Sequence, residues 1–255
     1  PEEDWTIRVD SGQYSPWLGD SYANIASMGL SFQRSQNSGR LQPFADRVDF
    51  GRIEDAAIDS GLVFSNELLD AFPVHRVKMV AGELQEFYVN VAADGTFEWT
   101  TGSPSTPRLV EYFEANEINL LDGQIAEVNL EIDEWLKKVS RALRNGYVIT
   151  VDYGADAKEL YDPARRFGGT LRGFKSHRFV EDLLADAGSY DLTSTVNWTY
   201  VKQMGEKLGL KVVEFEQQEK FLLDADLLTQ LELELQAREN EVEKLLLSTA
   251  ARDMI

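Results

Sequence analysis

A string of polar and charged residues follows an apolar run in the first third of the chain. Asn66, Glu67 and Asp70 stand within five positions of one another, and Pro73 and His75 close the string. An amide and two carboxylates suit a guanidinium group, which presents a planar fork of donors and no acceptor. The string therefore predicts a site for a cationic group. The same residues also fit a helix start, with Asn66 as the N-cap and the carboxylates facing the helix dipole.

Three further groups of residues could line the same site. They are the pair Glu127 and Asn129, the run Asp152, Tyr153 and Gly154, and the downstream residues Thr170, His177, Asp191 and Thr193. Each group also has an ordinary structural interpretation. The first fits a cap before a helix, the second fits a turn that ends a strand, and a single histidine is often a surface or capping residue.

Two short apolar runs precede these polar groups and must position them. Gly61–Ser65 and Tyr147–Val151 have the length and composition of strands buried on both faces of a parallel sheet. The segment Glu131–Arg144 has apolar residues at helical spacing, and Asn145-Gly146 would cap that helix. Helix followed by apolar strand is the α/β pattern, in which ligands bind at the carboxyl ends of the strands.

The remaining pattern predicts an antiparallel excursion and a helical end. We expect strands at 6–10, 47–50, 76–80, 84–91, 97–99 and 211–215, helices at 108–115, 198–208 and 227–247, and a loop-rich stretch over 155–190. Asp94-Gly95 supplies the hairpin turn between the second pair of these central strands.

The composition limits the possible functions. The chain has 255 residues with 44 acidic and 25 basic side chains, for a net charge of −19. This charge repels phosphate backbones, so nucleic acid is not expected as a partner, whereas a basic protein would be attracted. The chain has no cysteine and 2 histidines, which excludes thiolate metal ligation and argues against any metal site. No apolar run reaches the length of about 18 residues that spans a bilayer.

The polar groups occur in an order that resembles the MidA-like methyltransferase family. The string from Asn66 through Ala71, Phe72 and Pro73 to Arg76 is similar to the hallmark of that family. The resemblance continues through all of the polar groups above and ends at Gln218 and Phe221-Leu222, so that it covers about residues 41–223. This resemblance implies an α/β fold of class I, a Rossmann-like methyltransferase sheet with an inserted α+β subdomain on the substrate side.

The resemblance also implies a division of the chain. Residues 1–75 would form the remainder of the core that binds S-adenosylmethionine, 76–125 the antiparallel and helical insertion, and 126–255 the rest of the core with a loop-rich insertion around 155–200 and a C-terminal helix. The family has a glycine-rich loop on its first strand, and no such loop is recognisable in residues 1–45, where the glycines are scattered.

Site roles follow from the resemblance. Glu67 is the first choice for orienting a substrate arginine, with Asp70 second, Asn66 beside them, and His75 as proton acceptor. Asp10, Ser31 and Asn66 would bind S-adenosylmethionine. The substrate pocket would contain Pro73, Glu127, Asn129, Asp152, Tyr153, Gly154, Thr170, His177, Asp191 and Thr193.

The function implied by the resemblance is methylation of arginine on a protein substrate, dependent on S-adenosylmethionine. Because the glycine-rich loop is not recognisable, the alternative is a non-catalytic assembly or scaffold protein that retains the fold. A nucleotide-dependent oxidoreductase would also need that loop and leaves the Asn-Glu string unexplained. We expect a bacterial cytoplasm as the compartment, or the mitochondrial matrix in a eukaryote. A homodimer is compatible with the C-terminal helix.

Overall fold

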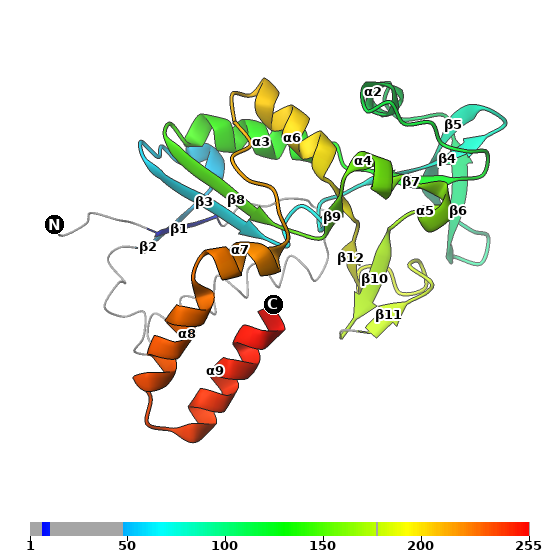
Figure 1. Ribbon diagram of the computed structural model, residues 1–255. Helices are drawn as coiled ribbons and strands as arrows, with labels where there is room; N and C mark the ends of the chain where they lie inside the picture. The colour runs from blue at the N-terminus through cyan, green and yellow to red at the C-terminus, as the bar shows by residue number, and fades with distance from the viewer. Residues whose placement is uncertain (1–6, 11–47, 177, 255) are drawn as a thin grey trace. The chain divides into compact units, whose positions relative to one another are not determined.

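The computed structural model describes residues 7–10, 48–176 and 178–254 of the chain (Figure 1). Ser31 and His177, which we expect near the cofactor and the substrate, lie outside the described residues. The chain divides into two units, residues 1–210 and residues 211–255, and each is described by itself.

The first unit contains two pairs of parallel strands. β1 (Ile7–Asp10) pairs with β2 (Val48–Gly51), and β3 (Gly61–Asn66) pairs with β8 (Gly146–Val151). Within the described residues these pairs are separate sheets, whereas the sequence predicts one continuous parallel sheet. The predicted strands at 6–10, 47–50, 61–65 and 147–151 are confirmed over the residues that the structure describes.

The prediction that both faces of β3 are buried is wrong. Val63 packs against the hydrophobic core, but its neighbours Leu62 and Phe64 are 54% and 61% exposed. Among the described residues of this unit, helices α3 (Glu131–Ala142) and α6 (Trp198–Lys207) lie side by side over one face of the β3–β8 pair (Figure 1). Successive side chains of a strand alternate between faces, so only every second one reaches these helices.

Helix α3 follows the predicted amphipathic pattern but ends earlier than predicted. Ile132, Trp135 and Val139 are buried on its inner face, as the helical spacing requires. The helix ends at Ala142, and Leu143 is already extended, so Asn145-Gly146 is not its cap. Gly146 instead opens β8 with a φ of +135°, and a Cβ there would lie 1.8 Å from the carbonyl oxygen of Gly61.

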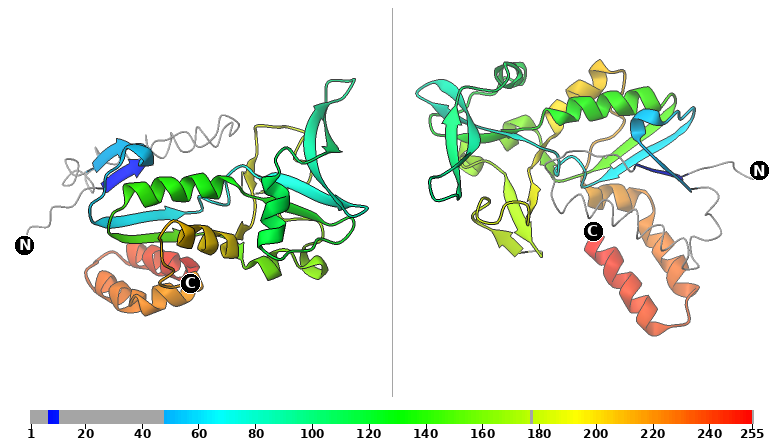
Figure 2. Two further views of the ribbon diagram at one scale, coloured as in Figure 1. Left: turned by 90° about the horizontal axis from the view of Figure 1, so that it is seen from above. Right: turned by 180° about the vertical axis from the view of Figure 1, so that it is seen from behind.

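The antiparallel excursion predicted between the parallel strands is confirmed. β4 (His75–Val80), β5 (Glu83–Val91), β6 (Phe97–Gly102) and β7 (Ile125–Val128) form one sheet in the order β6-β5-β4-β7. Helix α2 (Arg108–Ala115) connects β6 to β7 in the chain. The two other views show the same arrangement, with this sheet beyond the carboxyl ends of β3 and β8 (Figure 2).

The stretch predicted as loop-rich contains several short elements. These are β9 (Gly154–Ala155), α4 (Ala157–Leu160), α5 (Pro163–Arg166), β10 (Arg172–Lys175), β11 (Arg178–Val180), β12 (Asp191–Thr193) and β13 (Val196–Asn197). β10 is the centre of a small antiparallel sheet with β11 and β12, and β13 pairs with β9 in parallel. The β9–β13 pairing places the start of helix α6 beside the segment that follows β8.

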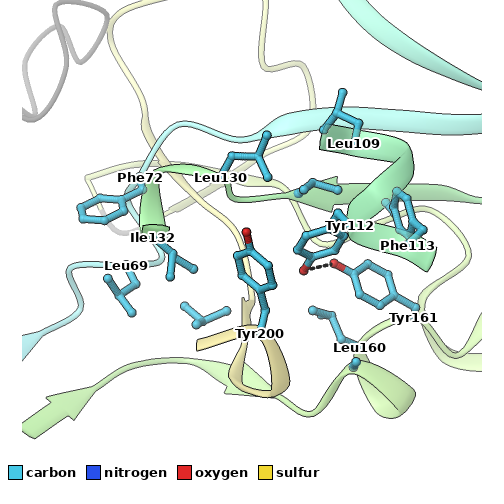
Figure 3. Packing of buried hydrophobic residues seen from close by; sticks show 14 of the residues in the cluster. Leu69, Phe72, Leu109, Tyr112, Phe113, Leu130, Ile132, Leu160, Tyr161 and Tyr200 are labelled. Carbon is cyan, nitrogen blue, oxygen red and sulfur yellow. Dashed lines mark hydrogen bonds between the residues drawn. The ribbon is translucent and has the colours of Figure 1, made fainter. Parts of the chain in front are cut away.

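The core of the first unit contains a chain of buried hydroxyl groups among its apolar side chains (Figure 3). The hydroxyl of Tyr112 lies 2.9 Å from that of Tyr161, which donates to the carbonyl oxygen of Glu127. Asn197 donates to the Tyr112 hydroxyl at 2.7 Å. The network joins α2 to the residue that follows α4 and to the N-cap of α6, and both hydroxyls have a partner.

The second unit corrects two predictions. It contains α7 (Gln218–Asp224), α8 (Leu227–Gln236) and α9 (Glu241–Met254), so the predicted helix at 227–247 is in fact two helices. Helix α9 begins with a local N-cap, because the side-chain oxygen of Asn240 accepts from the backbone N–H of Val242 at 2.9 Å. The predicted strand at 211–215 is absent from the described residues, since an apolar alternating segment needs a strand to pair with.

Candidate functional site

The carboxyl ends of β3 and β8 lie side by side and bring two of the predicted polar groups together. Asn66 pairs with Val151 in the ladder, and the N–H of Glu67 donates to the Val151 carbonyl at 2.8 Å. Asp152 follows directly. The parallel register therefore places Glu67 and Asp152 at the same edge of the sheet, although Asp152 follows Glu67 by 85 positions in the sequence.

The segment after Asn66 is a turn rather than a helix, so the capped-helix interpretation is wrong. Residues 67–72 contain no helical residue, and Glu67 has a φ of +47°. This left-handed conformation is uncommon for a residue other than glycine and costs on the order of 1 kcal/mol. The turn directs the following backbone N–H groups toward β8, where a carboxylate binds them.

Three contacts hold this turn, which we call the 67–72 loop. Oδ2 of Asp152 accepts from the N–H groups of Leu68 and Leu69 at 3.1 and 2.8 Å. The side-chain amide of Asn129 donates to the carbonyl oxygen of Leu69 at 2.9 Å. The N–H of Ser194 donates to the carbonyl oxygen of Asp70 at 2.9 Å. The loop is thus fixed from three segments that are distant in sequence.

Three carboxylates crowd this edge of the sheet. Burial raises the pKa of Asp152 to about 6, and the negative charge of Asp70 adds to the rise. Burial is also the main cause that raises the pKa of Asp70, and the negative charge of Glu67 raises it further. The positive charge of Arg172 lowers it. Mutual repulsion in a partly desolvated site makes the cluster of Glu67, Asp70 and Asp152 favourable for a bound cation.

Tyr153 extends the cluster at its exposed side. The charge of Glu67 raises the pKa of Tyr153, and burial and a hydrogen bond to Glu67 act in the same direction. The ring of Tyr153 is 62% exposed, so it is available to a ligand at the edge of the site.

Glu127, from the second predicted group, forms a buried ion pair with Arg76. Glu127 is buried, and its Oε1 lies 3.4 Å from Nε of Arg76. Its other oxygen accepts from the N–H and the hydroxyl of Thr170, which joins two of the predicted pocket residues. Burial raises the pKa of Glu127, whereas the N–H of Thr170 and the charge of Arg76 work against the rise.

His75 contacts a different carboxylate from those of the cluster. Its Nδ1 lies 2.7 Å from Oε1 of Glu86, which is buried and also accepts from the N–H of Ser105. Burial works to raise the pKa of Glu86, but the hydrogen bonds from His75 and Ser105 outweigh it and lower that pKa. No hydrogen bond within the described residues joins His75 to the three clustered carboxylates.

The other predicted site residues are more dispersed. Asp10 ends β1, and Pro73 is exposed in the connection to β4. Asp191 and Thr193 lie at the two ends of β12, where Thr193 pairs with Arg172. Gly154 has a packing role, because a Cβ there would lie 2.0 Å from Nε1 of Trp198.

Two residues at the site are absent from the prediction. Arg172 is the cation whose charge acts on Asp70, and Ser194 binds the 67–72 loop through its backbone. Arg172 follows Thr170 by two positions, which is the only signal that points to it. A backbone contact such as that of Ser194 leaves no mark in the residue type.

Neither a metal centre nor a membrane span is found in the described part of the chain. No group of three or more histidine, aspartate or glutamate side chains there is arranged to hold a metal ion. Its helices are too short or too polar to cross a bilayer.

Residues 28–216 match the model of a protein family described as "Putative S-adenosyl-L-methionine-dependent methyltransferase", and the chain belongs to this family. This match confirms the resemblance drawn from the Asn66–Arg76 string and the ordered motifs after it.

Curated relatives carry a more specific name. The chain is 27% identical over 165 residues to the mitochondrial protein arginine methyltransferase NDUFAF7 homolog of Drosophila melanogaster. The aligned region covers 62% of this chain and 35% of that protein. It is 23% identical over 154 residues to NDUFAF7 of Danio rerio, covering 60% and 34%. The chain thus spans about a third of the length of these relatives.

Two solved structures from Burkholderia thailandensis have a similar fold. The first contains S-adenosyl-homocysteine and is 23% identical, with a TM-score of 0.77 over 98% of this chain and 67% of that one. The second, a native structure, gives 0.78 at 23% identity and covers 98% and 70%. The likeness shows a common fold and confirms the α/β prediction.

Proposed function

We propose that this protein transfers a methyl group from S-adenosylmethionine to an arginine side chain of a protein substrate. One observation carries the proposal: Glu67, Asp70 and Asp152 converge at the carboxyl ends of β3 and β8, where burial and mutual repulsion raise the pKa of Asp70 and of Asp152. A guanidinium is always charged, and it matches such a cluster in charge and in hydrogen bonding.

The cofactor fits the residues at these strand ends by their chemistry. Asp10 ends β1 and Asn66 ends β3, so both residues fall at carboxyl ends of strands, where α/β folds bind their ligands. Ser31 is the third proposed contact. S-adenosylmethionine supplies an electrophilic methyl group on a sulfonium, and the carboxylates also suit the positive charge of that sulfonium.

The chain's own residues would position and activate the acceptor. Glu67 orients the guanidinium and draws positive charge away from the attacking nitrogen, with Asp70 behind it. The methyl–sulfur bond breaks as the methyl–nitrogen bond forms, and the nitrogen then loses a proton. Asp152 is suited to receive this proton because its pKa of about 6 lies near neutral pH. His75 as the acceptor stays a prediction.

The remaining predicted residues would form the walls. Tyr153 and Gly154 continue from Asp152, while Asn129 holds the loop that carries Asp70. Pro73, Glu127, Thr170, His177, Asp191 and Thr193 are proposed as the outer pocket. The domain boundaries at residues 75 and 125, and the substrate-side role of the antiparallel sheet, are part of the same proposal.

The test combines binding and product analysis on the full-length protein. S-adenosyl-homocysteine is titrated by calorimetry, and arginine and lysine peptides are then incubated with S-adenosylmethionine and analysed by mass spectrometry. Micromolar binding and a mass gain on arginine alone are expected. Binding with methylation of lysine would overturn the arginine assignment. A folded protein that binds neither cofactor form would leave the non-catalytic scaffold as the better account.

Compartment and oligomeric state are left as predictions. The curated relatives named above are mitochondrial in their own organisms. The homodimer and the bacterial cytoplasm follow only from the sequence.

A further inference from the structure

A cleft of about 360 Å³ lies beside the candidate site, between the four-stranded sheet and the segment that follows β11. Arg76 and Trp99 line it from the sheet, and Phe179, Glu181 and Asp182 line it from the opposite wall. A volume of this size is in the range of ligand pockets, and no step of the proposed methyl transfer uses it.

Arg76 forms the fixed inner end of this cleft. Its guanidinium lies 5.0 Å from the centre of the Phe87 ring and 5.3 Å from that of Trp99, while its Nε faces Glu127. Phe87 and Trp99 meet edge to face at 5.9 Å. The cation is therefore held between a carboxylate and two rings, which makes this end of the cleft rigid.

An apolar face continues from the cleft along the β5–β6 hairpin. Val89 pairs with Trp99 and Val91 pairs with Phe97, so all four side chains project from the same face of the hairpin. Val89, Val91 and Phe97 are 51%, 59% and 47% exposed. Adjacent exposed apolar side chains of this kind mark binding surfaces more often than isolated ones do.

The opposite wall combines an exposed ring with two carboxylates. Phe179 is 61% exposed, and Glu181 and Asp182, which follow it by two and three positions, are also exposed. An aromatic ring beside carboxylates is complementary to basic side chains, which bind both by charge and through the ring face. The net charge of −19 makes the approach of a basic segment favourable as well.

The cleft is connected to the candidate site through the start of β10. Leu171, which lines the cleft, precedes the Arg172 whose charge acts on Asp70. A peptide with one residue at the carboxylate cluster could therefore continue into the cleft.

We infer that this cleft binds the segment of the protein substrate that flanks the methylated arginine, and that it selects a segment with alternating basic and apolar side chains. The inference rests on the proposed function. Glu181 and Asp182 hold the basic side chains, and Trp99 with the exposed hairpin face receives the apolar ones.

The test measures peptide affinity by fluorescence anisotropy on the full-length protein. The probe is a labelled peptide of alternating arginine and leucine, compared with an isosteric peptide of citrulline and leucine. The double variant Glu181→Lys/Asp182→Lys should weaken binding of the arginine peptide about tenfold and leave the citrulline peptide nearly unaffected. Phe179→Ser should weaken both peptides, and this exposed position is expected to tolerate the change.

The matched control is Glu111→Lys/Glu114→Lys on the exposed side of α2, which changes the net charge by the same amount. Equal weakening by this control, or unchanged affinity in the cleft variants, would overturn the inference. So would a change of oligomeric state in the cleft variants without a change of peptide affinity, because the face would then be a contact between copies of the chain. Titration of S-adenosyl-homocysteine into the same variants should be unchanged. If the wild-type protein does not bind S-adenosyl-homocysteine, the proposed function itself is refuted.

Discussion

At the scale of single residues, Glu67 combines an unfavourable backbone with a position at the centre of the proposed chemistry. Its φ of +47° is a conformation that glycine adopts freely and glutamate does not. A strained residue that persists at a site of converging carboxylates supports a functional role for its side chain.

Two substitutions of Glu67 should separate stability from activity. Glu67→Gly relieves the strain and should raise the free energy of unfolding by about 1 kcal/mol. Glu67→Gln keeps the strained backbone and should raise that free energy by less, because it only relieves the repulsion between Glu67 and Asp70. Both should lower kcat on an arginine peptide roughly hundredfold, because the carboxylate is lost. Denaturant unfolding and single-turnover kinetics measure the two quantities. Full activity in either variant would remove Glu67 from the mechanism.

Asp152 makes stability depend on pH in a predictable direction. Its pKa is raised from 3.8 to about 6, so the folded state binds a proton more tightly than the unfolded state does. The stabilising contribution of the protonated form is complete below pH 4 and is lost as the pH rises through 6. Asp152→Asn can still accept from Leu68 and Leu69 and has no charge to desolvate, although its amide nitrogen cannot replace the second oxygen, which accepts from the N–H of Tyr153.

Melting temperatures of the wild type and Asp152→Asn from pH 4 to pH 8 test this prediction. As the pH rises, the free energy of unfolding of the variant should increase relative to that of the wild type. Above pH 6 this difference should reach about 1 kcal/mol, a small value because partial solvent exposure screens the charge of Asp152. Asp152→Ala, which removes the acceptor, should lose stability at every pH. A constant difference between wild type and the asparagine variant would show that Asp152 has an ordinary pKa in the folded state.

At the scale of elements, the site depends on how strands and loops from distant parts of the chain meet. β9 is only two residues long, yet its parallel pairing with β13 aligns helix α6 with the chain leaving β8. Gly154 permits this close approach, because the Trp198 ring occupies the space that a side chain would need.

Gly154→Ala should therefore destabilise the protein by about 1–3 kcal/mol, which is the usual cost of overpacking. It should also weaken the binding of a cationic substrate, since Asp152 lies two residues before it. Gly188→Ala provides a comparison for the loss of a glycine, because no atom lies within 4 Å of a Cβ there, although its φ of +92° adds strain. Thermal unfolding of both variants and of the wild type measures the loss of stability at each position. A Gly154→Ala protein as stable as the wild type would show that Trp198 moves aside at little cost.

At the scale of the whole molecule, the excess of acidic side chains dominates the electrostatics. With 44 acidic against 25 basic residues, charges of one sign repel one another across the folded surface. The same excess favours encounters with basic substrates, so one property has opposite effects on stability and on association.

Raising the salt concentration should therefore change these two quantities in opposite directions. The melting temperature should rise by about 2–4 °C between low salt and 0.5 M NaCl, corresponding to roughly 1 kcal/mol. The association rate of the arginine–leucine peptide should fall over the same range. Calorimetry and stopped-flow anisotropy measure the two effects, with the citrulline peptide as the control for association. A melting temperature that falls with salt would indicate that attractive ion pairs outweigh the net repulsion.

The sequence by itself determined the elements whose signals are local. The apolar runs ending at Ser65 and Val151 predicted β3 and β8, and the spacing of Ile132, Trp135 and Val139 predicted α3, because strand and helix periods depend on nearest neighbours. The ordered motifs also determined the family. These signals place Glu67 and Asp152 at strand ends, which is as far as local pattern can reach.

Only the tertiary structure decided what those strand ends contact. The bonds from Asp152 to the 67–72 loop join positions more than 80 residues apart, and the contacts of Asn129, Arg172 and Ser194 depend on the same packing. The absence of the predicted strand at 211–215 from the described residues had the same cause, since a strand partner is a property of the surroundings. Side-chain pattern reports burial and local propensity, whereas a site requires distant segments to meet.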